Sequence, residues 1–347
     1  MEKVRAIVYG IGAMGSGMVR LMLAKDWIEI VGGINRAHPD LKDKSKVKVG
    51  KDLGEVAGVG RKIGVIVSDN PDDVLAKAKA NLVLHATSSP LSEVEAQIIN
   101  CVEAGCNVIS IAEVRLAYPW VHNSESGQRI DEAAKKNGVT VLFTGINPGF
   151  MMDLVPIMFT GVCASVRKIT LWRLLDISPY GSGVLNNLGV GLSVSEFEKG
   201  LADGSIGWIL PLTCPQIDMI GDAIGWKLDE TKRIVKPITS NKPKKTSYGV
   251  EIGAGKVCGV KWSYFGIKDG EALITFDWIH MLHPEEEGLE PEDRCFIEGE
   301  SDIDLVVKKL DSGVGTYAHA VNAIPQVMQA QPGLLTVREL PVAAVLP

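Results

Sequence analysis

Short apolar runs alternate with segments of helical spacing through the first half of the chain. Alternation of apolar strands with amphipathic helices indicates βαβ units, and hence a parallel sheet with helices on both faces. Ser92 is a candidate helix N-cap, and Gly105 and Gly138 mark helix ends. The expected strands are residues 4–9, 28–34, 81–87, 107–111 and 139–144, and the expected helices are 18–23, 92–104 and 127–137.

The second half of the chain has a different pattern. An apolar helix is expected over residues 150–160, and strand candidates with weaker helical punctuation follow it. These strands indicate an α+β domain built around a mixed or antiparallel sheet. A second apolar helix, residues 316–329, contains Pro325 and is expected to be kinked there. The expected strands are residues 168–175, 250–252, 262–267, 271–278 and 303–307.

Composition narrows the class of protein. The 347 residues are 46% hydrophobic and 22% charged, which is ordinary for a soluble globular enzyme of about two domains. The net charge of −6 argues against a nucleic-acid partner. No apolar run approaches the ~20 residues of a membrane span, and a glycine turn interrupts the N-terminal apolar run too early for a secretory signal. The six cysteines include no Cys-x-x-Cys pair, so we expect reduced thiols and a cytoplasmic protein.

The first strand ends in a glycine-rich turn. Gly10, Gly12 and Gly15 form G-x-G-x-x-G, with Ala13 and Met14 between the last two. The first glycine permits the tight turn, the second lets a pyrophosphate approach the backbone, and the third lets helix and strand pack closely. The phosphates would sit at the helix N-terminus, where free N–H groups favour anions. The alternative is a glycine-rich turn that binds no ligand.

The end of the second strand indicates which dinucleotide would bind. NAD enzymes commonly place Asp or Glu there to bond the ribose 2′-hydroxyl, whereas this chain has Asn35 and Arg36. A guanidinium suits a 2′-phosphate, so we expect NADP(H) to be preferred, with NAD(H) possible. The alternative is that Arg36 is a solvated loop charge and both cofactors bind.

Ligands of such folds lie beyond the carboxyl ends of the strands. Thr87 and Ser88 occupy one strand end, where their hydroxyls could border the nicotinamide ribose. Ala112 and Glu113 follow another strand. Because that strand is apolar, Glu113 is expected to be partly desolvated with a raised pKa, as suits proton transfer. Glu113 could equally cap a helix or form an ion pair with Arg115.

Three weaker features favour structural roles. His280 and His283 are spaced like a metal pair, but Pro284 follows directly and no third ligand has matching spacing, so we expect no metal site. Residues 285–287 are three glutamates and are expected to form a solvated turn. The tryptophans, Trp262 and Trp278 among them, are expected in the core or in a pocket wall.

Eight motifs distributed over nearly the whole chain carry a family resemblance. They resemble those of the 2,4-diaminopentanoate dehydrogenases and related native amine dehydrogenases, a branch of the dihydrodipicolinate-reductase-like proteins. The motifs are YGIGAMG (9–15), GKDLGE (50–55), HATSS (85–89), ISIAE (109–113), YPW (118–120), TGINPGF (144–150), NAIP (322–325) and QPGL (331–334).

The resemblance implies oxidation of an amine to an imine with NAD(P)+, followed by hydrolysis to a ketone and ammonia, and the reverse amination. It places the catalytic carboxylate at Glu113, which would deprotonate ammonium and stabilise the iminium. It also implies a homodimer. The implied domains are a dinucleotide-binding Rossmann domain (1–146), an α+β substrate and dimerisation domain (147–314), and a C-terminal helix and tail returning to the first domain (315–347).

The resemblance also implies a pocket beside the cofactor. Asn147 and Asn322 would contact the cofactor. Pro148 and Asn322 also have structural interpretations, as a turn-shaping residue and as the cap of a kinked helix. The implied substrate-pocket residues are Pro148, Phe150, Met151, Tyr180 and Thr316.

Two departures bear on the substrate. The His-His-rich active-site helix of dihydrodipicolinate reductases is absent from the sequence, which argues against that reaction. The segment 207–214 is more apolar than expected for diaminopentanoate-like relatives, which would suit a more apolar substrate or an altered pocket wall. A diamino acid needs a carboxylate anchor, for which Arg173 and Arg115 are candidates, although Arg173 could instead pair with Asp176.

The sequence is therefore compatible with three functions. The first is an amine or diamino acid dehydrogenase. The second is another NADP-linked oxidoreductase of the same fold that acts on an alcohol, a semialdehyde or a cyclic imine. The third is a non-catalytic dinucleotide sensor.

Overall fold

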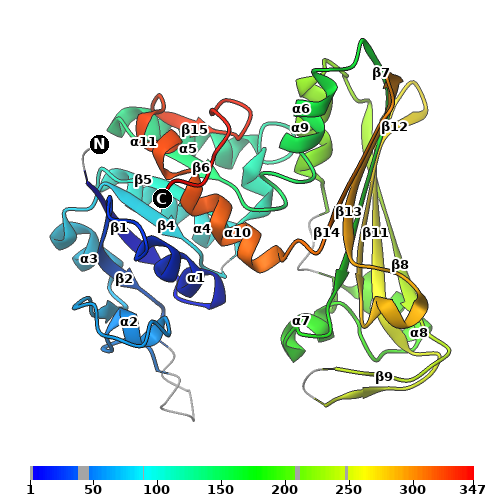
Figure 1. Ribbon diagram of the computed structural model, residues 1–347, viewed down its shortest axis with the longest axis horizontal. Coiled ribbons are helices and arrows are strands. Elements are labelled where there is room, and N and C mark those ends of the chain that lie inside the picture. Colours follow the sequence, from blue (N-terminus) through cyan, green and yellow to red (C-terminus); the bar gives the residue numbers. More distant parts are fainter. Residues whose placement is uncertain (1–2, 38–46, 89, 208–211, 247–248) are drawn as a thin grey trace. The chain divides into compact units, whose positions relative to one another are not determined.

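The computed structural model describes residues 3–37, 47–88, 90–207, 212–246 and 249–347. The chain divides into two compact units (Figure 1). Unit 1 comprises residues 1–150 and 311–347, and unit 2 comprises residues 151–310. The sequence analysis predicted these domain boundaries after residues 146 and 314. No helix in the described ranges is long and apolar enough to cross a membrane.

Unit 1 contains the predicted parallel sheet. All its neighbouring strands pair in parallel, in the order β15-β6-β5-β4-β1-β2-β3. The inner strands are almost entirely buried and largely apolar, as expected of a sheet covered on both faces. The Rossmann-like prediction is therefore confirmed. The strands are β1 (Val4–Tyr9), β2 (Ile28–Ile34), β3 (Val67–Ser68), β4 (Leu82–His85), β5 (Asn107–Ser110), β6 (Thr140–Phe143) and β15 (Gly333–Leu335).

Two helix details in unit 1 differ from the prediction. The N-cap before α4 is Pro90 rather than Ser92, because the extended backbone at Pro90 leads directly into the helix at Leu91. The C-terminal helix breaks at Ala323 instead of kinking, since Pro325 cannot donate a helical hydrogen bond. The helices are α1 (Ala13–Met22), α2 (Leu53–Val56), α3 (Pro71–Ala78), α4 (Leu91–Glu103), α5 (Ser124–Asn137), α10 (Ser312–Asn322) and α11 (Ile324–Gln329), with a 3-10 turn η2 (Val114–Ala117).

The C-terminal segment is an integral part of unit 1. Helix α10 packs against α1, where a Cβ on Gly17 would lie 2.5 Å from the Tyr317 ring. Strand β15 then extends the sheet beside β6. The last 37 residues thus complete the nucleotide-type fold begun by the first 150.

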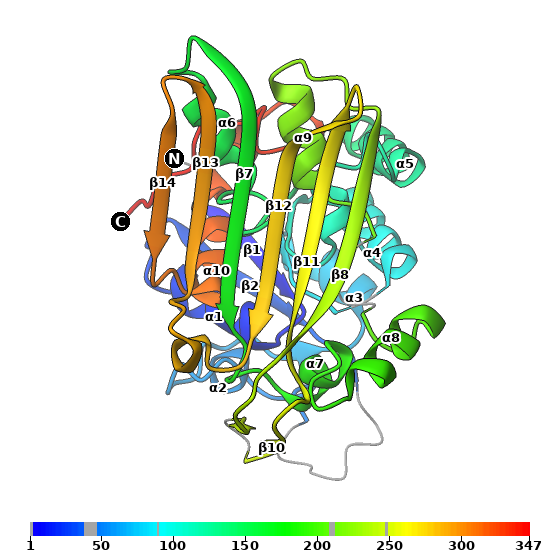
Figure 2. The same cartoon turned by 90° about the vertical axis from the view of Figure 1, so that its right-hand side faces the viewer.

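Unit 2 is built on a six-stranded mixed sheet, which confirms the predicted class (Figure 2). The strand order is β14-β13-β7-β12-β11-β8, and only β7 and β12 pair in parallel. Helix α6 packs against β13, and α9 against β11 and β12. The strands are β7 (Ser165–Asp176), β8 (Glu230–Thr239), β11 (Val257–Lys268), β12 (Glu271–Met281), β13 (Glu292–Glu300) and β14 (Ile303–Lys308), with a small hairpin of β9 (Lys244–Lys245) and β10 (Glu251–Ile252).

The expected helix 150–160 begins only at Leu154, because residues 150–153 form a turn that Asp153 closes by accepting from the Leu154 N–H. The helices of unit 2 are α6 (Leu154–Thr160), α7 (Ser182–Asn187), α8 (Val194–Asp203) and α9 (Pro215–Ala223), with a 3-10 turn η3 (Pro284–Glu287).

Candidate cofactor and active site

The three glycines of the turn between β1 and α1 have different steric surroundings. Gly10 has φ +94°, and an added Cβ would lie 2.5 Å from the Ala86 carbonyl oxygen. A Cβ on Gly15 would lie 2.0 Å from the Gly10 carbonyl oxygen, so this glycine permits close packing of helix and strand. A Cβ on Gly12 would meet nothing within 4 Å. The space in front of Gly12 is therefore open, as a bound pyrophosphate requires.

The same turn begins α1, whose N-cap is Gly12. Among the described residues no side chain caps this helix, so its first N–H groups stay available for an anion. Ala13 and Met14 are the first two helical residues. The predicted phosphate cradle thus has the required form.

A pocket of about 380 Å³ lies beside the turn. It brings together Gly10, Gly12, Asn35, Arg36, Thr87 and Ser88, all of which were predicted from sequence to bind the cofactor. The sequence reasoning missed four further polar lining residues, Tyr9, Lys48, Asp69 and Gln97. The full lining is Tyr9, Gly10, Ile11, Gly12, Ile34, Asn35, Arg36, Lys48, Asp69, Pro71, Ala86, Thr87, Ser88 and Gln97.

Two cations line this pocket. The exposed guanidinium of Arg36 forms an ion pair with Glu93 at 2.7 Å. The Lys48 ammonium donates to the Ile11 carbonyl oxygen at 2.5 Å. Asn35 acts on the turn itself, since its Oδ1 accepts from the Ile11 N–H at 2.9 Å. Asp69 contributes one carboxylate to the lining, which leaves an excess of positive charge.

A buried histidine positions the hydroxyl at the end of β4. His85 Nδ1 lies 2.9 Å from Ser110 Oγ, and its Nε2 lies 2.9 Å from Gln97 Oε1. Thr87 Oγ1 donates to the same Gln97 oxygen at 3.0 Å. Burial lowers the pKa of His85 to about 4, so the imidazole is neutral at physiological pH. This network holds Thr87 at the pocket.

Glu113 follows β5 and is 8% exposed. Its Oε1 accepts from the Arg115 backbone N–H at 3.1 Å, which makes it the N-cap of η2. Both carboxylate oxygens also accept from the Arg115 guanidinium, at 2.8 and 2.7 Å. Both structural interpretations of Glu113 are therefore correct. The bidentate contact stabilises the ionised carboxylate and fixes its orientation.

The turn after β6 gathers further predicted residues in unit 1. A Cβ on Gly149, at φ +119°, would lie 2.3 Å from Thr144 Oγ1, so the turn requires glycine there. The Ile146 N–H donates to Thr316 Oγ1 at 3.4 Å, and the Phe150 ring lies 5.1 Å from that of His319. Asn147 and Pro148 form the tip of this turn, and Asn322 is the last residue of α10. Met151 and Tyr180 belong to unit 2, where Met151 is buried and Tyr180 lies between β7 and α7.

The residues of unit 1 fit a nicotinamide dinucleotide. Besides the glycine cradle, unit 1 holds buried polar atoms with no hydrogen-bond partner among the described residues: Thr144 Oγ1, His319 Nε2 and Asn322 Oδ1. Buried polar atoms are nearly always paired in native proteins, so a polar ligand group is their natural partner. A carboxamide or a ribose hydroxyl supplies the matching donors and acceptors.

The alternative that Arg173 forms an ion pair with Asp176 is wrong. Arg173 pairs with Asp293 at 3.1 Å, and both side chains are buried. Asp176 instead accepts from the backbone N–H groups of Ser178 and His283. The physical reason is that residues three apart on a strand point to opposite faces.

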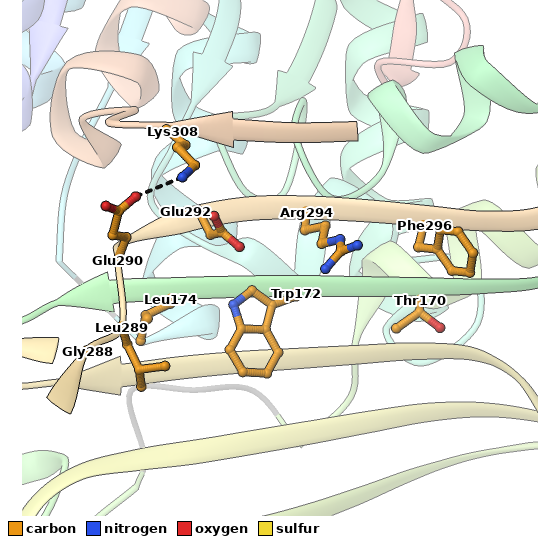
Figure 3. Close-up of a pocket in the computed structure, with 10 residues that line it drawn as sticks. All are labelled: Thr170, Trp172, Leu174, Gly288, Leu289, Glu290, Glu292, Arg294, Phe296 and Lys308. Atoms are coloured by element: carbon orange, nitrogen blue, oxygen red, sulfur yellow. Dashed lines mark hydrogen bonds and ion pairs between the residues drawn. The ribbon is translucent and has the colours of Figure 1, made fainter. Parts of the chain in front are cut away.

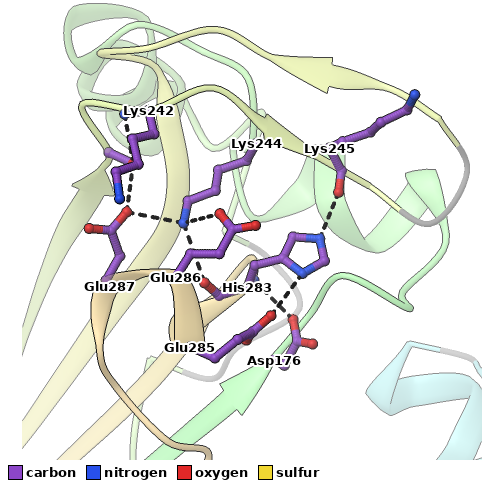
Figure 4. A network of polar contacts seen from close by, with 9 residues as sticks. Asp176, Lys242, Lys244, Lys245, His283, Glu285, Glu286 and Glu287 are labelled. Carbon is purple, nitrogen blue, oxygen red and sulfur yellow. Dashed lines mark hydrogen bonds and ion pairs between the residues drawn. The ribbon is translucent and has the colours of Figure 1, made fainter.

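The two histidines of the weak metal motif have different surroundings. His280 is buried and its pKa is lowered to about 3 by burial. His283 lies with Asp176 and Glu285, whose potential ligand atoms are within 4.8 Å of one another (Figure 4). Its Nδ1 lies 3.2 Å from Glu285, and its Nε2 lies 2.7 Å from the Lys245 carbonyl oxygen. Hydrogen bonds within the protein therefore explain why these three side chains lie together.

The three glutamates at 285–287 are exposed and lie in the turn η3, as expected of a solvated charged turn. Glu286 and Glu287 form ion pairs with the buried ammonium of Lys244 at 2.8 and 3.0 Å (Figure 4). They hold η3 against the β9–β10 hairpin. In the apolar segment 207–214, residues 208–211 lie outside the described residues, and a Cβ on Gly207 would lie 3.2 Å from the Trp262 ring.

A parallel sheet, an open phosphate cradle and a pocket at its strand ends define a dehydrogenase of the nicotinamide dinucleotide class. Residues 150–347 match the 2,4-diaminopentanoate dehydrogenase C-terminal domain, and residues 4–110 match the dihydrodipicolinate reductase N-terminus. The chain belongs to the 2,4-diaminopentanoate dehydrogenase family, which confirms the resemblance seen in its motifs.

Three relatives cover nearly the whole chain. A 2,4-diaminopentanoate dehydrogenase of Acetoanaerobium sticklandii is 39% identical over 99% of this chain and 94% of its own. An amine dehydrogenase of Streptomyces virginiae is 25% identical over 97% of this chain and 96% of its own. The solved amine dehydrogenase of Mycobacterium smegmatis superposes with a TM-score of 0.84 at 26% identity, covering 99% of this chain and 97% of that one. These homologues are oxidoreductases that act on CH–NH2 groups.

Proposed function

We propose that the protein catalyses NAD(P)-dependent oxidative deamination of an amine or a 2,4-diaminopentanoate-type diamino acid, and the reverse reductive amination. The observation that carries this proposal is Glu113, a buried carboxylate at a strand end of the dinucleotide-binding sheet, in a chain whose relatives act on amines. The substrate ammonium first loses a proton from nitrogen, and the resulting amine then loses a hydride from carbon to give an iminium. Water then adds to the resulting iminium and releases a ketone and ammonia.

Glu113 has two tasks in this reaction. In the oxidative direction it accepts the proton from the substrate ammonium, because only the free amine can release a hydride. Glu113 then passes this proton to solvent, and its restored negative charge stabilises the iminium. The Arg115 guanidinium orients the carboxylate through both of its oxygens. A nicotinamide bound at the cradle would supply the hydride acceptor.

The test is NADP+ reduction at alkaline pH with 2,4-diaminopentanoate, short alkylamines, cyclohexylamine and the matching alcohols. Glu113→Gln keeps the side-chain shape and should lower kcat at least ~100-fold while NADPH still binds. Glu103→Gln, an exposed change at the end of α4, is the matched control. Turnover of alcohols alone, or full activity of Glu113→Gln, would refute the proposal.

We propose that NADP(H) is the preferred cofactor and that NAD(H) also binds. Arg36 and Lys48 line one pocket, and a dianionic 2′-phosphate gains from both charges. Glu93, which forms an exposed ion pair with Arg36, would have to release this guanidinium to the 2′-phosphate.

We further propose a homodimer formed through the face of the unit 2 sheet that carries Trp172 and Phe296. This face has a groove of about 630 Å³ across β7, β13 and β14 (Figure 3). The groove mixes apolar side chains with both signs of charge, such as Arg294 and Glu292, which suits a self-complementary twofold interface. Light scattering tests this, and Phe296→Glu should yield monomers. A monomeric wild type would refute it.

A further inference from the structure

Four buried side chains form a row across the unit 2 sheet. Trp278 on β12 lies opposite Arg173 on β7, and Arg173 lies opposite Asp293 on β13. On its other side, Trp278 lies opposite Trp262 on β11. Residues directly opposite each other on neighbouring strands share a face. The face with this row is the reverse of the one that carries Trp172, since Trp172 and Arg173 are adjacent on one strand.

A fifth residue joins this row on the same face. His280 lies two positions after Trp278 on β12, and the two rings are 5.4 Å apart. Burial lowers the pKa of Arg173, and Asp293 and Tyr180 act in the opposite direction. Tyr180 was predicted from sequence to line the substrate pocket.

Several polar atoms in this row lack a protein partner. Trp262 Nε1, Trp278 Nε1, His280 Nδ1 and Asp293 Oδ1 are buried and have no hydrogen-bond partner in the described part of the chain. Each exception to the pairing of buried polar atoms calls for an explanation. Four such atoms on one sheet face, beside a buried ion pair, indicate that the missing partner is a polar ligand.

The chemistry of the atoms describes that ligand. Indole and guanidinium groups only donate hydrogen bonds, whereas Asp293 Oδ1 only accepts while it is ionised. Trp278, Arg173 and Asp293 occupy three adjacent strands, about 4.8 Å apart. An α-amino acid head group carries an accepting carboxylate and a donating ammonium on one carbon, and it matches both sides of the row.

Charge balance favours the same ligand. Arg173 and Asp293 together are neutral, and burial keeps His280 uncharged by lowering its pKa. A zwitterion adds no net charge to this buried site, whereas a phosphate or a simple carboxylate would add at least one. Burial raises the pKa of Asp293 to about 6, so a cationic partner such as an ammonium would stabilise its ionised form.

We propose that Trp278, Arg173, Asp293 and His280, here called the polar row, bind the amino acid end of the substrate. This inference rests on the proposed amine dehydrogenase function. The indole N–H of Trp278 and the guanidinium of Arg173 hold the carboxylate, and Asp293 Oδ1 accepts from the α-ammonium. The polar row selects a diamino acid over a simple amine.

Three substrates that share the reacting amine test this inference. They are 2,4-diaminopentanoate, 4-aminopentanoate, which lacks the α-ammonium, and 2-aminopentane, which lacks both groups. Trp278→Phe keeps a ring but removes the N–H, and should raise the KM for both carboxylates about tenfold at unchanged kcat. It should leave 2-aminopentane unaffected. Trp226→Phe, in the half-buried loop after α9, is the control.

Asp293→Asn separates the two halves of the head group. It should raise the KM for 2,4-diaminopentanoate but not for 4-aminopentanoate, because only the first carries the α-ammonium. Since this change also leaves Arg173 without its carboxylate, thermal unfolding is measured first, and a variant that does not fold is replaced by Trp278→Phe alone. Equal effects of Trp278→Phe on all three substrates would overturn the inference.

Calorimetric titration of 2,4-diaminopentanoate into the NADPH complex, which cannot turn over, separates this inference from the proposed function. Binding that Trp278→Phe weakens, in a protein that oxidises no amine, supports the polar row and refutes the function. If wild type and Trp278→Phe oxidise each of 2-aminopentane and 2,4-diaminopentanoate with the same kcat/KM, the polar row is refuted. The proposed function is then left intact.

Discussion

Gly12 and Gly15 belong to one motif, yet the structure predicts opposite consequences for replacing them with alanine. A Cβ at Gly12 meets no protein atom within 4 Å, and its backbone is extended, with φ −87°. Alanine lowers the entropy of the unfolded chain, which stabilises by about 0.4–1 kcal/mol. It is a poorer N-cap than glycine by a similar amount. The free energy of unfolding should therefore change by less than about 0.5 kcal/mol.

The methyl group of Gly12→Ala would instead occupy the space of the pyrophosphate. Losing one charge-assisted hydrogen bond from α1 weakens binding by about 1.5–3 kcal/mol, and NADPH affinity should fall about 10- to 100-fold. Gly15→Ala sets a methyl carbon 2.0 Å from the Gly10 carbonyl oxygen, which is backbone and cannot rotate away. Overpacking of this kind costs about 1–3 kcal/mol, which lowers Tm by several degrees.

Thermal unfolding without ligand and NADPH fluorescence titration measure the two effects separately. Gly12→Ala should keep the wild-type Tm and lose affinity, whereas Gly15→Ala should lose Tm. Wild-type NADPH affinity in Gly12→Ala would show that the turn is no phosphate cradle. An unchanged Tm in Gly15→Ala would refute the steric argument.

Three further changes test other parts of the structure. Arg36→Ala should raise the KM for NADP+ far more than that for NAD+, and equal effects on the two would contradict the assignment of the 2′-phosphate. The buried neutral His85 has a pKa lowered from 6.5 to about 4, so it contributes stability that is present above pH 6.5 and is lost as pH falls towards 4. His85→Gln should therefore flatten the loss of stability over that window in pH-dependent denaturant unfolding, and an unchanged slope would argue against a neutral buried imidazole. Lys244→Met should lower the free energy of unfolding by about 1–2 kcal/mol, below the ~3 kcal/mol of a fully buried pair, because Glu286 and Glu287 stay partly in water. A denaturant midpoint equal to that of the wild type would show that this ion-pair network contributes nothing.

The parallel sheet of unit 1 could be predicted because its strands are buried on both faces and read as continuous apolar runs. Two strands of unit 2 could not. In β8, Lys232 and Arg233 precede Ile234 and Val235, so charged and apolar residues do not alternate, and Pro237 argues against a strand interior. The proline is tolerated because β8 is the edge strand. β13 carries five charged residues among its nine, and only pairing with β7 and β14 makes it a strand.

The cofactor pocket likewise contains residues that could be predicted from the sequence and one that could not. The strand-end rule located Thr87, Ser88, Asn35 and Arg36, because parallel strands bring their carboxyl ends to one edge. Lys48 could not be located this way, since it follows no strand and lies in a lysine-rich stretch with no periodicity. Its contact with Ile11 joins residues 37 apart in sequence. A rule based on the ends of strands makes no prediction about such a residue.

Arg173 shows what strand periodicity alone could have excluded. Asp176 is its neighbour in sequence, but an odd separation along a strand places the two side chains on opposite faces. Extending the predicted strand 168–175 by one residue would therefore have excluded Asp176 as a partner. The actual partner, Asp293, is 120 residues away and is chosen by the antiparallel register of β7 and β13. The same register sets Arg173 beside Trp278. The site proposed to distinguish a diamino acid from a simple amine thus depends on strand pairings that no local pattern encodes, whereas the phosphate cradle depends on six consecutive residues.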